Sequence, residues 1–195
     1  MFTGLPQSLA LLGAVLAYYV LDNALLLRYD RLRAYGSSRS WSYTAFAVAA
    51  ALALILQPIF WPGLGLRLPA GWGLALQIVG GVCVIAALSL HWWARNHLRQ
   101  FFGERVEIQP GQTLIRTGPY AFVRHPIYTS FLTLSFGVLL INPAVTTAVI
   151  MLYSLWDFTQ ITRHEDGLLA ASLPGYADYM REVPRFFPNL FKRRS

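Results

Sequence analysis

The sequence predicts an all-α integral membrane protein with about five transmembrane helices that form one domain, residues 1–195. Three observations support this fold class. Apolar residues make up 55% of the 195-residue chain and charged residues only 13%, proportions that are unusual for a soluble domain. Several apolar segments approach the roughly 20 residues that a helix needs to cross a bilayer. The cations are concentrated between alternate apolar segments, as in multi-pass membrane proteins.

Three N-terminal spans are expected within residues 1–93. Each is an apolar run close to the length that a bilayer requires. The runs cover residues 8–27, 43–61 and 72–93. No lysine or arginine precedes the first run, whereas a cleaved signal peptide begins with a basic region. We therefore expect the first segment to remain as a helix.

A helical hairpin is expected in the second half of the chain. The apolar block from Ile127 to about Trp156 is too long for one ordinary span, and Asn142-Pro143 interrupts it. Because proline cannot continue a helix, we expect the first, short arm to end near Ile141. The second arm is expected to continue as a helix to about Leu173.

Basic residues predict the orientation of these spans. The chain has 16 lysines and arginines and a net charge of +7. Only one of these cations, Arg67, lies in the loop between the second and third spans. Cytoplasmic loops are enriched in cations, so five spans place the N-terminus outside and the C-terminus in the cytoplasm. The same charges would attract anionic lipid, and they require no nucleic-acid partner. We expect a multi-pass protein, in the inner membrane if the cell is bacterial.

Two polar segments are expected to meet at the cytoplasmic face, one on each side of the hairpin. The first contains GPYAFVRHPIY, in which Gly118 tolerates a backbone conformation that is unfavourable for other residues. Pro119 and Pro126 are expected to hold non-helical turns. The second segment follows the hairpin and is expected to break at Pro174-Gly175 before a short helix.

No metal site is expected. Cys83 is the only cysteine, which excludes a cysteine cluster. His91 and His97 are six residues apart, a spacing that puts them on different faces of a helix. Taken singly, Arg124 and His125 are explained by side chains that reach toward lipid headgroups. A functional interpretation therefore depends on the two polar segments together.

Together, the two segments resemble the isoprenylcysteine carboxyl methyltransferase family of integral membrane methyltransferases, which is related to the phospholipid N-methyltransferases. The matching motifs are TGPYAFVRHPIY and, downstream, RHEDGLL followed by GYADYMREVPRFFP. The resemblance covers about Leu98 to Pro188. It implies an enzyme that binds S-adenosylmethionine at its cytoplasmic end and admits a lipid-like or prenylated acceptor from the bilayer. Residues 94–195 would then form a cofactor-binding region with the hairpin and a cytoplasmic tail.

The resemblance also implies which residues hold the cofactor. By position, the family's contacts fall on a stretch before the first motif, on the motif itself and on a glutamate after the hairpin. These residues are Gln112, Thr113, Leu114, Ile115, Tyr120, His125, Pro126, Ile127, Tyr128 and Glu165. A sulfonium cofactor with an ammonium, a carboxylate and an adenine needs a carboxylate, hydrogen-bond donors and aromatic surface. The two motifs supply all three.

Two arginines are candidates for a catalytic role. In the prenylcysteine branch of the family an arginine precedes the contacting glutamate by one helical turn, but this chain has Ile161 there. We therefore consider Arg99 and Arg163 as residues that hold an acceptor carboxylate. Carboxylate O-methylation is favoured because a carboxylate is already ionised at neutral pH, whereas an amine must first lose a proton.

Three alternatives remain open from the sequence. The first is a phospholipid or amine N-methyltransferase. The second is an NADPH-dependent membrane reductase of related architecture, and the third is a non-enzymatic membrane scaffold. The identity of the acceptor and the oligomeric state are not predicted.

Overall fold

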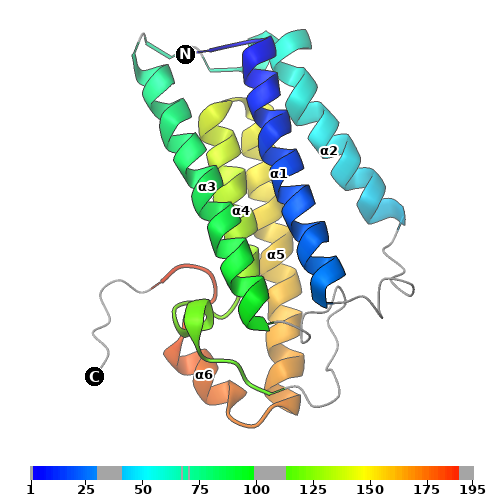
Figure 1. Ribbon diagram of the computed structural model, residues 1–195, viewed down its shortest axis with the longest axis vertical. Coiled ribbons are helices and arrows are strands. Elements are labelled where there is room, and N and C mark those ends of the chain that lie inside the picture. Colours follow the sequence, from blue (N-terminus) through cyan, green and yellow to red (C-terminus); the bar gives the residue numbers. More distant parts are fainter. Residues whose placement is uncertain (1, 30–40, 67, 70, 99–112, 189–195) are drawn as a thin grey trace.

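The computed structural model describes residues 2–29, 41–66, 68–69, 71–98 and 113–188. Long helices run beside one another, and α6 lies at the end where the last long helix projects (Figure 1). The long helices are α1 (Leu5–Tyr29), α2 (Trp41–Phe60), α3 (Trp72–Leu98), α4 (Pro126–Ile141) and α5 (Val145–Ser172). The short ones are η1 (Pro62–Leu64), η3 (Gly118–Ala121) and α6 (Tyr176–Glu182).

The helices lie where the sequence predicts them. Each of α1, α2 and α3 covers the apolar run that predicted it, and α4 and α5 form the hairpin on either side of Asn142-Pro143. The break at Pro174-Gly175 is also confirmed, because α5 ends before it and α6 begins after it.

The expected turns at the two motif prolines are wrong. Pro126 is the first residue of α4 and Pro119 lies within the 3-10 helix η3. The reason is that proline has a fixed φ and no N–H group, which suits the first residues of a helix.

Two helical segments are long and apolar enough to cross a membrane, Leu5–Arg28 and Trp72–Leu98. Shorter apolar helical segments cover Val48–Phe60 and Pro126–Ile141. Large apolar side chains such as Val82 and Leu152 point outward from the bundle. The number of membrane crossings and their orientation stay predictions.

The helices α3 and α4 approach closely because glycines face each other. A Cβ atom added at Gly80 would lie 2.7 Å from the carbonyl oxygen of Gly137, and one added at Gly137 would lie 2.8 Å from that of Gly80. Small residues of this kind let helix backbones come into contact. The two helices are thereby packed tightly near the end of α4.

A polar cluster joins α1, α3 and α4 inside the bundle. His91 is fully buried, and its Nε2 lies 2.9 Å from Oδ1 of Asp22. On the other side of the ring, Nδ1 lies 2.5 Å from the Tyr18 hydroxyl, which lies 2.9 Å from Oγ of Ser130. Because buried polar groups need partners, this cluster stabilises the packing of the three helices.

Candidate functional site

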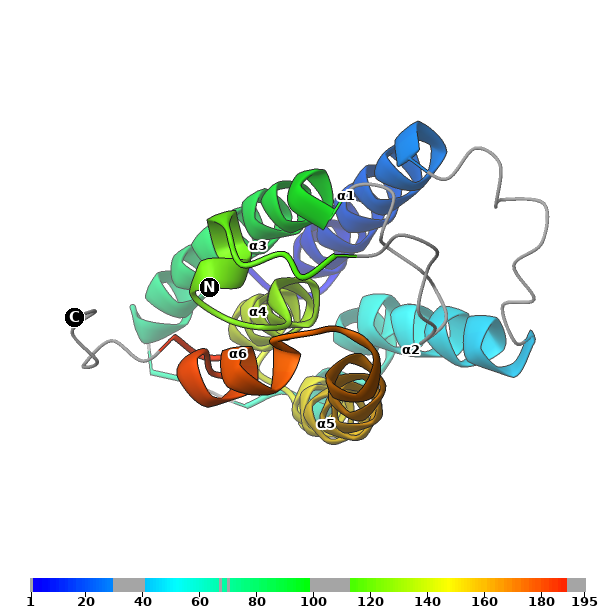
Figure 2. The ribbon, with the colours of Figure 1, turned by 90° about the horizontal axis from the view of Figure 1, so that it is seen from below.

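The two sequence motifs meet at the end of the bundle that carries η3 and α6. Figures 1 and 2 show α6 beside the projecting end of α5 and η3 between α3 and α6. The backbone N–H of Arg124 donates to the carbonyl oxygen of Pro184 at 2.9 Å, and that of His125 donates to Arg185 at 3.1 Å. The RHP and VPRFFP segments therefore pair directly, although about 60 residues separate them in the sequence.

Two contacts fix the position of η3. Gly118 has φ +58°, in the region that favours glycine, and a Cβ atom there would lie 2.3 Å from Nε2 of His97. The role predicted for Gly118 is thus confirmed. The Tyr179 hydroxyl donates to the carbonyl oxygen of Tyr120 at 2.6 Å. Consequently η3 is held between the end of α3 and α6.

Asp166 is the centre of a buried charged cluster. Its carboxylate accepts hydrogen bonds from Arg124 at 2.9 Å, from the Tyr176 hydroxyl at 2.8 Å and from Arg185 at 3.0 Å. Nε2 of His125 lies 2.9 Å away. We call these five residues the Asp166 cluster. Burial alone would raise the pKa of Asp166, but the hydrogen bonds from His125, Arg124 and Tyr176 hold it well below its usual range.

Glu165 lies beside the Asp166 cluster but is held differently. Its Oε2 is 3.6 Å from Nδ1 of His125, which is beyond hydrogen-bond distance. Within the part of the chain that the structure describes, this buried oxygen has no hydrogen-bond partner. Burial raises the pKa of Glu165, and the nearby His125 opposes that effect. A buried acceptor without a donor is costly, so a ligand that donates a hydrogen bond here would be stabilised.

The predicted cofactor residues of the first motif surround this site. Tyr128 is partly exposed, and its ring packs against His125 and Phe158 with centroid distances of 5.9 and 5.3 Å. The other four are buried: Tyr120, His125, Pro126 and Ile127. Of these five residues, His125 approaches Glu165 directly, at 3.6 Å.

The stretch that precedes the first motif is less enclosed. Thr113 is exposed, whereas Leu114 and Ile115 are partly buried. Leu114 packs against the cluster formed by Leu173, Tyr176 and Tyr179. The predicted contact at Gln112 lies outside the described residues.

The two catalytic candidates are not seen at the site. Arg99 lies outside the described residues. Arg163 is exposed on α5, whereas Asp166, three residues later, is buried. A role for either arginine in holding an acceptor stays a prediction.

Sequence reasoning missed the part played by Asp166, Tyr176 and Arg185. Asp166 follows Glu165 in the RHEDGLL motif, but the sequence analysis predicts no contact for it. One signal could have identified it. The arginines of the RHP and VPRFFP motifs would need a carboxylate if they were buried, and Asp166 remains once Glu165 is assigned to the cofactor.

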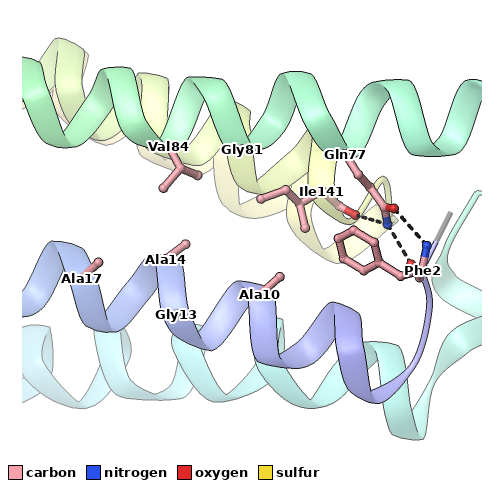
Figure 3. A pocket seen from close by; sticks show the side chains of 9 residues that line it. All are labelled: Phe2, Ala10, Gly13, Ala14, Ala17, Gln77, Gly81, Val84 and Ile141. Atoms are coloured by element: carbon pink, nitrogen blue, oxygen red, sulfur yellow. Dashed lines mark hydrogen bonds between the residues drawn. The ribbon is translucent and has the colours of Figure 1, made fainter.

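A separate cavity lies toward the other end of the bundle, between α1 and α3 (Figure 3). Its volume is about 280 Å³, and small residues such as Ala14 and Gly81 line it. At its edge the Gln77 side chain donates to the carbonyl oxygen of Phe2 at 2.7 Å and accepts from the Phe2 N–H at 3.0 Å. We assign no chemistry to this cavity, because the polar groups at its edge bind one another.

Comparison with known proteins identifies relatives of the region that holds the site. Residues 79–171 match the sequence model of the isoprenylcysteine carboxyl methyltransferase (ICMT) family. The chain is 38% identical over 80 residues to the cobalt-zinc-cadmium resistance protein CzcN of Cupriavidus metallidurans. This alignment covers 40% of this chain and 37% of that protein. It is 29% identical over 156 residues to the protein-S-isoprenylcysteine O-methyltransferase of Mus musculus. That alignment covers 77% of this chain and 53% of that enzyme.

A solved structure shows the same fold. The structure of the eukaryotic intramembrane Ras methyltransferase ICMT matches with a TM-score of 0.69 and 23% identity, over 94% of this chain and 68% of that chain. The chain thus spans about a third to a half of the two curated relatives named above. The family match over residues 79–171 contains the first motif and RHEDGLL, on which the resemblance in the sequence rested.

Proposed function

We propose that this protein is an S-adenosylmethionine-dependent methyltransferase that works at the cytoplasmic face of a membrane. Its acceptor is a lipid-like or prenylated small molecule, and carboxylate O-methylation is favoured. One observation carries the proposal: the buried oxygen of Glu165, without a hydrogen-bond partner among the described residues, lies beside His125 of the other motif. The family match over residues 79–171 supports it.

The residues present fit this cofactor. An ammonium group would complete the hydrogen bonding of Glu165 and balance its charge. The rings of Tyr120 and Tyr128 offer surfaces suited to a sulfonium or an adenine. When bound, S-adenosylmethionine supplies an activated methyl group. The protein's own residues would bind it, orient it and exclude water.

The Asp166 cluster gives this site a fixed shape. Asp166 holds Nε2 of His125, so that Nδ1 of the same ring faces Glu165. Arg124 and Arg185 tie both motif segments to the same carboxylate. Alignment of reacting groups can contribute on the order of 7 to 11 kcal/mol to a displacement reaction. A rigid wall therefore suits methyl transfer, and a carboxylate acceptor would need no general base.

The exposed side chains of α3 support embedding in a bilayer. Trp72 and Trp92 are 69% and 52% exposed, and large apolar side chains face outward between them. At about 1.5 Å per residue, these tryptophans stand roughly 30 Å apart, which is the thickness of the hydrocarbon core. Tryptophan favours both membrane interfaces. The Asp166 cluster would then lie near the interface marked by Trp92, on the basic side of the protein.

Calorimetry on detergent-purified protein tests the cofactor assignment. We expect S-adenosylmethionine and its demethylated product to bind, and the substitutions His125→Ala and Glu165→Gln to abolish that binding. Binding of NADPH without binding of S-adenosylmethionine would instead support the reductase. If neither ligand bound and neither substitution had any effect, the scaffold would be favoured.

Membranes incubated with cofactor that carries a radiolabelled methyl group test the acceptor. We expect label in an extractable apolar product and release of that label by mild base, because methyl esters hydrolyse readily. Label that resists base would indicate N-methylation. Label confined to protein would contradict a small acceptor.

A further inference from the structure

Arg95 is a buried cation that lies outside both motifs. It is on α3, and its side chain is 0% exposed, like those of Ala87 and His91. Residues four apart lie on one face of a helix, so these three form a stripe that α3 buries. The guanidinium of Arg95 therefore points into the protein at the end where α4 begins, and not toward solvent or lipid.

Tyr120 connects Arg95 with Glu165. The element that carries Tyr120, η3, packs against α3. Burial raises the pKa of Tyr120, the charge of Glu165 raises it further, and the charge of Arg95 opposes them. The packing agrees with this: a Cβ atom at Gly118 of η3 would lie 2.3 Å from Nε2 of His97, two residues after Arg95, so the end of α3 that carries Arg95 lies against η3. A fully buried cation and a partly exposed carboxylate with one buried oxygen thus lie at the end of the bundle where η3 packs.

A site with one buried charge of each sign suits a zwitterion. The amino-acid end of the proposed cofactor carries an ammonium and a carboxylate on one carbon atom. Glu165 has a buried oxygen that can accept from the ammonium, and the planar fork of an arginine matches a carboxylate. We propose that Arg95 binds the carboxylate of the cofactor's amino-acid group, while Glu165 binds its ammonium.

This inference rests on the proposed function, and it names a binding residue for the same site. A carboxylate can come from two sources, the cofactor or the acceptor. The cofactor is favoured because its two charged groups are joined to a single carbon, and Arg95 and Glu165 lie at the same end of the bundle. The experiment below distinguishes these sources.

The test compares S-adenosylhomocysteine with its decarboxylated analogue, which has the same thioether and amine but no carboxylate. Dissociation constants are measured by calorimetry for the wild type, for Arg95→Met and for the control Arg181→Met, whose exposed side chain pairs with Asp178 on α6. We expect the wild type and the control to prefer the carboxylate ligand by roughly 10- to 150-fold, the range for a charge-assisted hydrogen bond. We expect Arg95→Met to bind both ligands alike.

Several outcomes would overturn the inference. One is an equal affinity of the wild type for the two ligands, a result that needs no variant. Another is an unchanged preference in Arg95→Met. A rise in the acceptor's KM with an unchanged preference between the cofactor analogues would assign the guanidinium to the acceptor instead. If Arg95→Met fails to fold, Arg95→Gln carries the same comparison. A wild type that binds neither ligand would refute the proposed function itself.

Discussion

The two ends of the helix bundle are both closed by buried polar side chains, but the chemistry of the two ends differs. Where α4 finishes, the groups are neutral amides. Gln7 and Gln77 donate to the carbonyl oxygen of Ile141 at 2.9 and 3.2 Å, and Asn142 donates to Gln57. Where α4 begins, the groups are the charged residues of the Asp166 cluster and Glu165.

The two ends also differ in which buried groups lack a hydrogen-bond partner. The amides provide partners for the free carbonyl at the end of a helix, and they also bind one another. At the charged end Asp166 has four partners, but Glu165 retains a buried oxygen without one among the described residues. At the amide end, the hydroxyls of Ser8 and Thr146 are also buried without a hydrogen-bond partner among the described residues. The charged end differs because its unsatisfied oxygen belongs to a carboxylate, which is costlier to leave without a donor than a hydroxyl, and a donating ligand would relieve that cost.

The largest effect is expected at the centre of the charged end. Asp166→Asn would leave Arg124, Arg185 and His125 without the charge that they share. Removing one partner of a buried ion pair costs about 3 to 5 kcal/mol, so we expect a loss of that size in the free energy of unfolding. Denaturant unfolding in detergent measures it, and cofactor binding should be lost as well.

Asp178→Asn is the matched control for this prediction. Asp178 pairs with Arg181 on α6, and both side chains are more than half exposed. Exposed ion pairs contribute about 0 to 1 kcal/mol. If the two aspartate substitutions had equal effects on unfolding, the Asp166 cluster would not have the structural role described above.

A smaller effect is expected at the amide end. Asn142→Ala removes partners from the buried side chains of Gln7 and Gln57. Leaving buried polar groups unsatisfied costs about 1 to 3 kcal/mol. The affinity for the cofactor should not change, because this end is separated from the site by the length of α4. A parallel loss of cofactor affinity would show that the two ends are coupled.

Acid should affect only the charged end. Hydrogen bonds lower the pKa of Asp166 in the folded protein, so its contribution is present above the unfolded pKa of about 3.9. That contribution is lost as the pH falls below about 4, by at most about 1.4 kcal/mol per pH unit. Thermal unfolding between pH 5 and pH 3 should show a steeper loss in the wild type than in Asp166→Asn. Equal slopes would contradict the lowered pKa.

The helices could be predicted from the sequence because their signals are local. Each apolar run has the length of its helix, and Asn142-Pro143 separates α4 from α5 within the chain itself. The pairing of the two motifs could also be predicted, because the alternation of spans puts both at one face. The Glu165 and His125 side chains are indeed within 3.6 Å.

The charge pairing within the site could not be predicted, because it depends on contacts between distant segments. Glu165 and Asp166 are adjacent in α5, and the packing of α6 and the VPRFFP segment decides which of them binds Arg124. Arg95 offers a second case. Near the end of a span it is typical of a residue that reaches toward headgroups, but it is fully buried at the end of α3 against which η3 packs.

The smallest expected effect on stability is also the one that separates stability from function. Burial raises the pKa of Glu165. A carboxyl whose pKa is higher in the folded protein than in the unfolded chain contributes its full stability below the unfolded pKa. That contribution is lost as the pH rises through the folded pKa. At neutral pH Glu165 is therefore a cost to the ligand-free protein, and Glu165→Gln should unfold no more easily than the wild type.

The same substitution should abolish cofactor binding, since the charge that holds the ammonium is gone. Unfolding curves and calorimetry on one preparation check both halves. A variant that lost stability but kept its cofactor would place Glu165 with the amides, as a structural residue.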